Sequence, residues 1–116
     1  MMVAFIAQKA SWDCELEPRF GRTPAIVLLD TERNSLALHD NTRNADLGHG
    51  AGIQTAQAIM EVGASAVITV SLGPKAFGIL QEATIPAYYA TSGHTIKMAW
   101  DLFQAKQLPR ADAPNH

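Results

Sequence analysis

The sequence has 116 residues, of which 47% are hydrophobic and 17% charged, and its formal net charge is −2. This size and balance are typical of one globular domain, and they disfavour nucleic acid as the main partner because binding it depends on neutralising phosphates. No apolar stretch approaches the roughly 20 residues that a membrane helix needs, and the first residues lack the basic region and cleavage site of a signal peptide.

The first half of the chain predicts three strands. Residues 3–7 form a short apolar run, residues 25–30 are "AIVLLD", and residues 35–40 continue with the alternation of "SLALHD". A long polar loop over residues 9–24 separates the first two strands, and loops of this length are often functional. We expect the three strands to form an antiparallel meander.

The second half alternates helices and strands. Apolar residues recur at helical spacing over residues 53–62, and "AVITV" at residues 66–70 is typical of a strand buried on both faces. A Gly-Pro pair at residues 73–74 opens a second helix. Residues 87–90 predict a short strand, and the apolar residues over 96–103 form the core face of a last helix.

Together these elements predict an α/β fold of three layers, with a mixed five-stranded sheet flanked by helices. Strand–helix–strand units form parallel pairs with right-handed crossovers, whereas the meander adds antiparallel strands. Three strands followed by helix, strand, helix, strand and helix are the order of the ribonuclease-H-like group. We expect a single domain over residues 1–107 and a flexible tail over residues 108–116, which contain two prolines and no pattern.

The stretch "DLGHGAGIQTAQAIM", residues 46–60, places three glycines at the start of the first predicted helix. Gly48, Gly50 and Gly52 allow another group to approach the backbone closely, and a helix N-terminus offers unpaired N–H groups to an anion. The alternative is a tight loop that only needs room against the sheet. Because the spacing is not GxGxxG, a dinucleotide-binding site is unsupported.

Two residues are candidate metal ligands. His49 is flanked by glycines, which favours a side chain that reaches outward over one that packs in the core, as a metal ligand, a general base or a surface residue. Cys14 is the only cysteine, so it forms no internal disulfide, which fits a reducing compartment such as the cytoplasm. Its acidic neighbours disfavour a nucleophilic thiolate, so ligation of a soft metal is its better chemical use.

Two arginines bracket a turn in the long first loop. The Phe20 side chain is expected to pack against the core and so anchor the loop, and Gly21 makes the turn. The side chains of Arg19 and Arg22 are then expected either to bind an anion or to form ion pairs with the glutamates of the same loop.

The residue patterns of common hydrolases and nucleases are missing. The first strand carries no acidic residue and Asp30 ends the second alone, whereas two-metal nucleases need several carboxylates at strand ends. Neither a GxSxG elbow nor a CxxC pair occurs. These absences disfavour two-metal nuclease chemistry, and no residue pattern indicates a hydrolase triad.

Three stretches of the chain resemble one family. "EPRFGRTPAIVLLD", "GHGAGIQTAQAIMEVGASAVIT" and "LGPKAFGILQEATIPAYYA" are similar, in this order, to phrases of the dinitrogenase iron-molybdenum cofactor biosynthesis family, the small Nif-type carrier proteins. The resemblance covers residues 3–107. It implies a non-catalytic protein that transiently binds the iron-molybdenum cofactor or its iron–sulfur precursor and delivers it.

The resemblance also implies where this cargo lies. By position, it places these cofactor-binding residues at one cleft: Arg19, Phe20, Gly21, Arg22, Gly48, Gly50, Gly52 and Gly73. Cys14 and His49 are the candidate ligands of its metal. The implied partners are metallocluster donor and recipient proteins, with no nucleic acid and no membrane, and the chain is expected to be a monomer or weak dimer. A domain that binds a small anionic metabolite, for regulation or catalysis, and a plain interaction domain are the alternatives.

Overall fold

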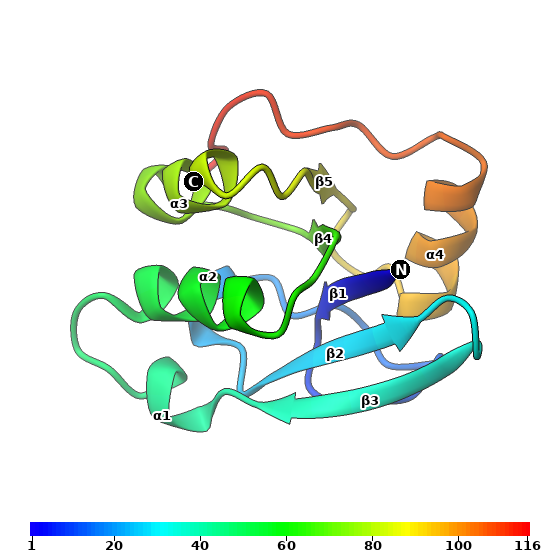
Figure 1. Ribbon diagram of the computed structural model, residues 1–116, viewed down its shortest axis with the longest axis horizontal. Helices are drawn as coiled ribbons and strands as arrows, with labels where there is room; N and C mark the ends of the chain where they lie inside the picture. The colour runs from blue at the N-terminus through cyan, green and yellow to red at the C-terminus, as the bar shows by residue number, and fades with distance from the viewer.

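The computed structural model describes residues 1–116, and at its centre lies a mixed five-stranded sheet (Figure 1). The strands are β1 (Met2–Ile6), β2 (Ala25–Asp30), β3 (Ser35–Asp40), β4 (Ala66–Thr69) and β5 (Ala87–Tyr89), in the spatial order β3-β2-β1-β4-β5. β2 pairs antiparallel with both β1 and β3, and β4 pairs parallel with both β1 and β5. The predicted antiparallel meander and the predicted parallel half are both confirmed.

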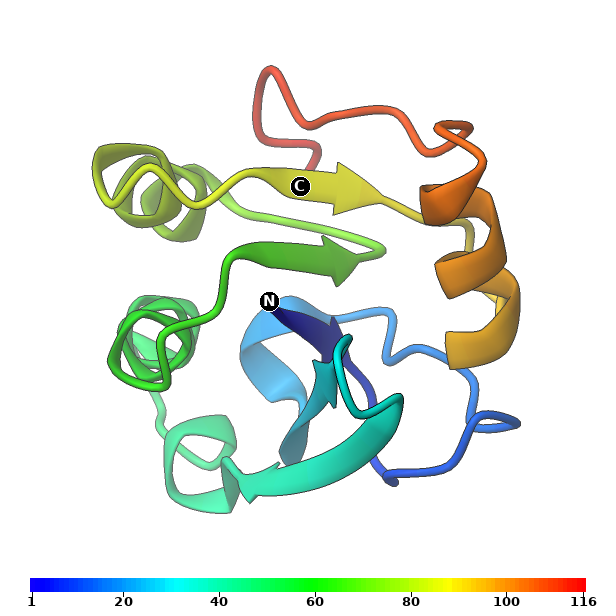
Figure 2. The same ribbon diagram turned by 45° about the vertical axis from the view of Figure 1, so that its right-hand side comes forward.

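Helices cover both faces of the sheet, which makes the α/β fold three layers deep (Figure 2). They are the 3-10 helix η1 (Phe20–Arg22) and the α-helices α1 (Thr42–Ala45), α2 (Ala51–Glu61), α3 (Pro74–Glu82) and α4 (Ile96–Gln104). α2 and α3 pack on one face through a core cluster that includes Ile59 and Leu80, and α4 packs on the other through Ile96 and Ala99. None of the helices combines the length and apolar character that crossing a bilayer requires.

The central strand β1 shows why the first apolar run holds no polar residue. Ala4 and Ile6 belong to the core cluster beneath α2 and α3, whereas Val3 and Phe5 belong to the cluster beneath α4. Successive side chains of a strand point to opposite faces, so a central strand between two helical layers is apolar at every position. All four side chains are fully buried.

The loop expected before the first helix contains the short helix α1, which the sequence pattern did not predict. The Asp40 carboxylate accepts hydrogen bonds from the backbone N–H and the hydroxyl of Thr42, at 2.9 and 2.7 Å, and these bonds lower the pKa of Asp40. The amide of buried Asn41 donates to the hydroxyl of Thr55 at 2.9 Å. This second contact ties the loop to α2.

The structure differs from the flexible tail predicted over residues 108–116, because these residues pack against the sheet. Leu108 and Ala111 are buried. Arg110 forms an antiparallel bridge with Tyr88 of β5. The segment therefore lies along the edge strand β5, where free backbone groups of the sheet supply hydrogen-bond partners that the residue pattern does not display.

Candidate functional site

A cleft of about 590 Å³ lies where η1 meets the beginnings of α2 and α3. α3 starts just beyond the carboxyl end of β4, so the cleft occupies the edge at which ligands bind in parallel α/β sheets. Its titratable lining residues are all basic or imidazole groups: Arg19, Arg22, His49, Lys75 and His116. No Asp or Glu lines it, so the cleft favours an anion.

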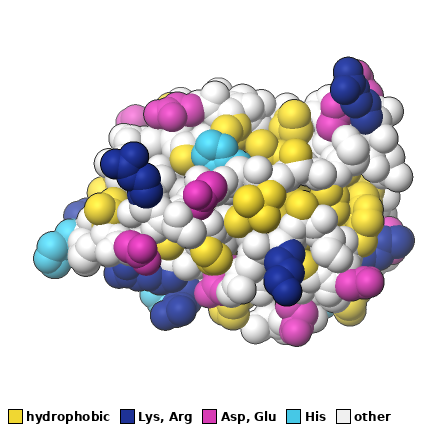
Figure 3. Space-filling view, turned by 90° about the horizontal axis from the view of Figure 1, so that it is seen from below, with side chains coloured by type: hydrophobic (Ala, Val, Ile, Leu, Met, Phe, Trp, Pro, Cys, Tyr) yellow, Lys and Arg dark blue, Asp and Glu magenta, His cyan; other side chains and the backbone are white.

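Lys and Arg side chains gather beside histidine at the left end of the surface in Figure 3, on the side of the molecule where α1 and α2 lie. Arg19, Arg22 and Lys75 supply the positive charge of the cleft itself. Because exposed charges act over a range of about 10 Å at moderate salt, these groups also attract an anion before contact.

Two helices present uncapped N-termini to the cleft. The N-cap residues of α2 and α3 are Gly50 and Gly73, and neither helix has a side-chain hydrogen bond at its start. α4 differs, because the hydroxyl of its N-cap Thr95 accepts a hydrogen bond from the N–H of Met98 at 3.1 Å. The first N–H groups of α2 and α3 thus stay free for a ligand, and both helix dipoles favour negative charge there.

The glycines of the cleft are required for different structural reasons, backbone conformation at Gly50 and close packing at Gly21. Gly50 alone among the three of the GHGAG loop has a left-handed backbone, with φ 78°, while a Cβ at Gly48 would meet nothing within 4 Å. The close approach belongs instead to Gly21, where a Cβ would lie 2.8 Å from the backbone nitrogen of Gly52. This contact lets η1 lie directly against the first turn of α2.

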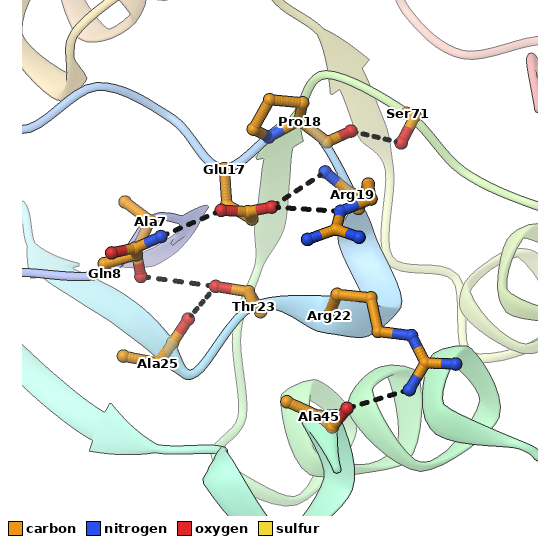
Figure 4. A network of polar contacts seen from close by, with 10 residues as sticks. All are labelled: Ala7, Gln8, Glu17, Pro18, Arg19, Arg22, Thr23, Ala25, Ala45 and Ser71. Carbon is orange, nitrogen blue, oxygen red and sulfur yellow. Dashed lines mark hydrogen bonds and ion pairs between the residues drawn. The ribbon is translucent and has the colours of Figure 1, made fainter. Parts of the chain in front are cut away.

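Arg22 fixes the GHGAG loop. Its Nη1 donates to the carbonyl oxygens of Ala45 and Leu47, at 2.9 and 2.7 Å, and Figure 4 shows the first of these bonds. The sequence predicts that Arg22 binds either an anion or a glutamate, whereas in the structure it binds backbone carbonyl oxygens. The guanidinium holds the end of α1 and the following loop to η1, while the residue also lines the cleft.

Arg19 pairs with Glu17. The Glu17 carboxylate is 8% exposed and accepts from the side-chain amide of Gln8 at 3.0 Å, while Arg19 Nε lies 3.6 Å from its other oxygen (Figure 4). The Arg19 side chain remains 71% exposed. Arg19 is therefore anchored at one nitrogen and leaves the rest of its guanidinium available for a ligand.

Other contacts join the two walls of the cleft to the core. The hydroxyl of Ser71, in the loop before α3, donates to the carbonyl oxygen of Pro18 at 2.6 Å (Figure 4). Phe20 is 3% exposed and belongs to the core cluster beneath α2 and α3, as the sequence predicted. The cleft is therefore built on packed and hydrogen-bonded elements.

The predicted ligand pair of Cys14 and His49 is not assembled in one place. His49 lines the cleft, but Cys14 lines a different hollow, and its Sγ donates to the carbonyl oxygen of Glu15. Backbone bonds from Ile96 N to the Cys14 carbonyl and from Leu16 N to the His94 carbonyl, both 2.9 Å, hold that loop beside α4. The structure groups no three His, Cys, Asp or Glu residues in a way that could hold a metal ion.

Three lining residues with polar or charged side chains are not among the predicted site residues: Ser71, Lys75 and His116. Lys75 follows the Gly-Pro start of α3, so the sequence alone places it in the first turn of that helix and could have identified it as a lining residue. His116 had no such signal, since only the packing of residues 108–116 brings it to the cleft.

The chain is similar to known proteins in sequence and in structure. The family model for dinitrogenase iron-molybdenum cofactor matches residues 1–106. An uncharacterised protein of Methanocaldococcus jannaschii is 30% identical over 81 residues, which cover 66% of this chain and 67% of the relative.

Solved structures are similar over almost the whole chain. The apo form of the orange protein from Desulfovibrio gigas is 36% identical with a TM-score of 0.94, and the match covers 99% of this chain and 96% of that one. A Thermotoga protein solved by NMR shares the fold, with 24% identity, a TM-score of 0.83 and coverage of 99% and 97%.

Proposed function

The chain belongs to the dinitrogenase iron-molybdenum cofactor family, and we propose that it binds an anionic metal–sulfur cluster in the cleft and delivers it without catalysing a reaction. The observation that carries this proposal is the lining of the cleft. Basic side chains and two uncapped helix N-termini converge there, and no acidic side chain opposes them. Such an arrangement suits a bulky anion such as the iron-molybdenum cofactor or an iron–sulfur precursor.

The residues present suit a cluster that arrives already assembled. An iron–sulfur cluster built on a protein is held by about four cysteine thiolates, and this chain has one cysteine, outside the cleft. A pre-assembled cluster brings its own sulfides, so the protein needs only to neutralise charge and contact the metal at few positions. In this proposal His49 makes one such contact, while Arg19, Lys75 and the free amides hold the charge.

Few direct ligands also suit release. Charge-assisted hydrogen bonds to exposed groups can be exchanged one at a time for those of a recipient protein, whereas several metal–thiolate bonds would hold the cluster firmly. The orange protein that this chain resembles was solved in its apo form, which supports a fold that is stable without its bound group.

We further propose donor and recipient proteins as partners and the cytoplasm as location. The strand order supports the ribonuclease-H-like assignment.

An anaerobic titration tests the proposal. Purified protein is mixed with isolated iron-molybdenum cofactor, and binding is followed by visible absorption and by co-elution on gel filtration. The Arg19→Ala/Lys75→Ala variant removes two cations from the cleft, and we expect a loss of about tenfold in affinity for each. The matched Arg33→Ala/Lys97→Ala variant removes the same charge from exposed positions that do not line the cleft, and it should bind as the wild type does.

Two results would overturn the proposal. One is equal binding by both double variants, because the cleft charge would then play no part. The other is stabilisation by phosphorylated or carboxylated metabolites together with no binding of the cluster, which would support a metabolite-binding domain in the same cleft.

A further inference from the structure

Residues 109–116 form a folded strap beside the cleft. Tyr89 N donates to the carbonyl of Pro109 at 2.9 Å and Ala111 N donates to that of Ala87 at 2.8 Å, so the strap first pairs with β5. It then turns back, as Figure 2 shows in red, and the Tyr89 hydroxyl donates to the carbonyl oxygen of Ala113 at 2.7 Å. These contacts lead the chain towards the loop between β4 and α3.

Asn115 clamps the strap to that loop through three hydrogen bonds. Its backbone N–H donates to the Leu72 carbonyl at 3.0 Å, and the Leu72 N–H donates in return to Asn115 Oδ1 at 2.8 Å. Its side-chain Nδ2 donates to the carbonyl of Val70 at 3.0 Å. Both polar atoms of the Asn115 side chain are bonded, so the backbone to which His116 is joined is held to the loop before α3.

We propose that His116 is a second imidazole contact for the cargo, and that Asn115 is its positioning residue. This inference rests on the proposed function. His49 precedes α2, and His116 follows Asn115, which is bonded to the loop that leads into α3, so both histidines line the cleft from different elements. A neutral imidazole is a good ligand for iron, nickel and similar metals.

The two imidazoles replace the pair of Cys14 and His49 that the sequence suggested. A carrier with imidazoles on two different elements contacts a cluster at two metal positions, and the basic residues of the cleft neutralise its sulfides. Because one of the two contacts lies on the strap, opening the strap would leave the cargo with a single imidazole ligand.

Nickel(II) ions alone provide a test that does not depend on cluster binding. In ¹H–¹⁵N spectra of the histidine rings, we expect nickel to broaden the His49 and His116 signals together, at the same concentration. Either His49→Ala or His116→Ala should weaken binding at the remaining ring about tenfold. His39 lies on β3 outside the cleft, so His39→Ala is the matched control and should leave the nickel response of the His49 and His116 rings unchanged. Independent broadening of the two rings at different concentrations would overturn the shared site.

Asn115→Ala tests the positioning role. We expect it to release the His116 ring from the shared nickel site while the His49 ring still responds, with the melting temperature measured alongside. If the His116 ring responds as in the wild type, Asn115 does not position it.

The cluster titration then separates this inference from the proposed function. His116→Ala should lower the affinity for isolated iron-molybdenum cofactor about tenfold. Unchanged affinity would overturn the role of His116 alone, whereas no binding of the cluster by the wild-type chain would overturn the proposed function itself.

Discussion

Gly21→Ala is a substitution that the close packing of η1 on α2 does not accommodate. The added Cβ would lie 2.8 Å from Gly52 N and 3.1 Å from Gly52 Cα, both of which are backbone atoms. No flexible side chain can move aside, so η1 and the first turn of α2 must separate. Overpacking of this kind costs about 1–3 kcal/mol, and backbone neighbours place the expected cost in the upper half of that range.

The assay is thermal and urea unfolding of the variant beside Gly48→Ala. A loss of about 2–3 kcal/mol should lower the melting temperature by roughly 10 °C in a domain of this size. A Cβ at Gly48 would meet nothing within 4 Å, so that variant should stay within about 0.5 kcal/mol of the wild type. Equal melting temperatures for the two variants would refute the close packing of η1 on α2.

Three further outcomes are expected. Arg22→Ala removes the hydrogen bonds to the carbonyls of Ala45 and Leu47. Hydrogen exchange of the amides of residues 46–50 should therefore become about tenfold faster. An unchanged exchange rate would show that other contacts hold the loop. Cys14→Ser should leave the affinity for the cluster unchanged in the anaerobic titration, because this residue lines a different hollow, and a loss of binding would count against the cleft. Burial raises the pKa of the Tyr89 hydroxyl above its ordinary value of 10.0, so folding favours the protonated form. The resulting stability is present below pH 10 and is lost as the pH rises through the raised pKa. The melting temperature of the wild type should therefore fall more steeply above pH 10 than that of Tyr89→Phe, and parallel curves would contradict this.

The sheet could be predicted because its strands are either short continuous apolar runs or short alternating segments. β1 is apolar throughout and β4 is apolar up to its last residue, Thr69, as suits strands buried on both faces, whereas β3 at the edge alternates. The helix α1 was missed because it has four residues and no apolar stripe. Local hydrogen bonds from Thr42 to Asp40 support it, and a pattern of hydrophobicity does not record such bonds.

The candidate site could be predicted in part for the same reason. The glycine-rich start of α2, the Gly-Pro start of α3 and the arginine turn are local features, and the structure brings all three to one cleft. The pairing of Cys14 with His49 was a tertiary inference without a local signal. Likewise, His116 reaches the cleft through hydrogen bonds between Asn115 and backbone groups of Val70 and Leu72, and nothing in a residue pattern displays such bonds.

In the proposed function, free amides at the starts of α2 and α3 hold the cargo together with the basic side chains of the cleft. A backbone ¹H–¹⁵N spectrum, recorded anaerobically during titration with isolated iron-molybdenum cofactor, shows whether these amides contact it. We predict that the amide signals of Gly52, Ile53, Lys75 and Ala76 broaden first, in parallel with the appearance of bound cluster. If the signals of the loop around Cys14 broaden first and those four amides stay sharp, the cleft is not the site that holds the cargo.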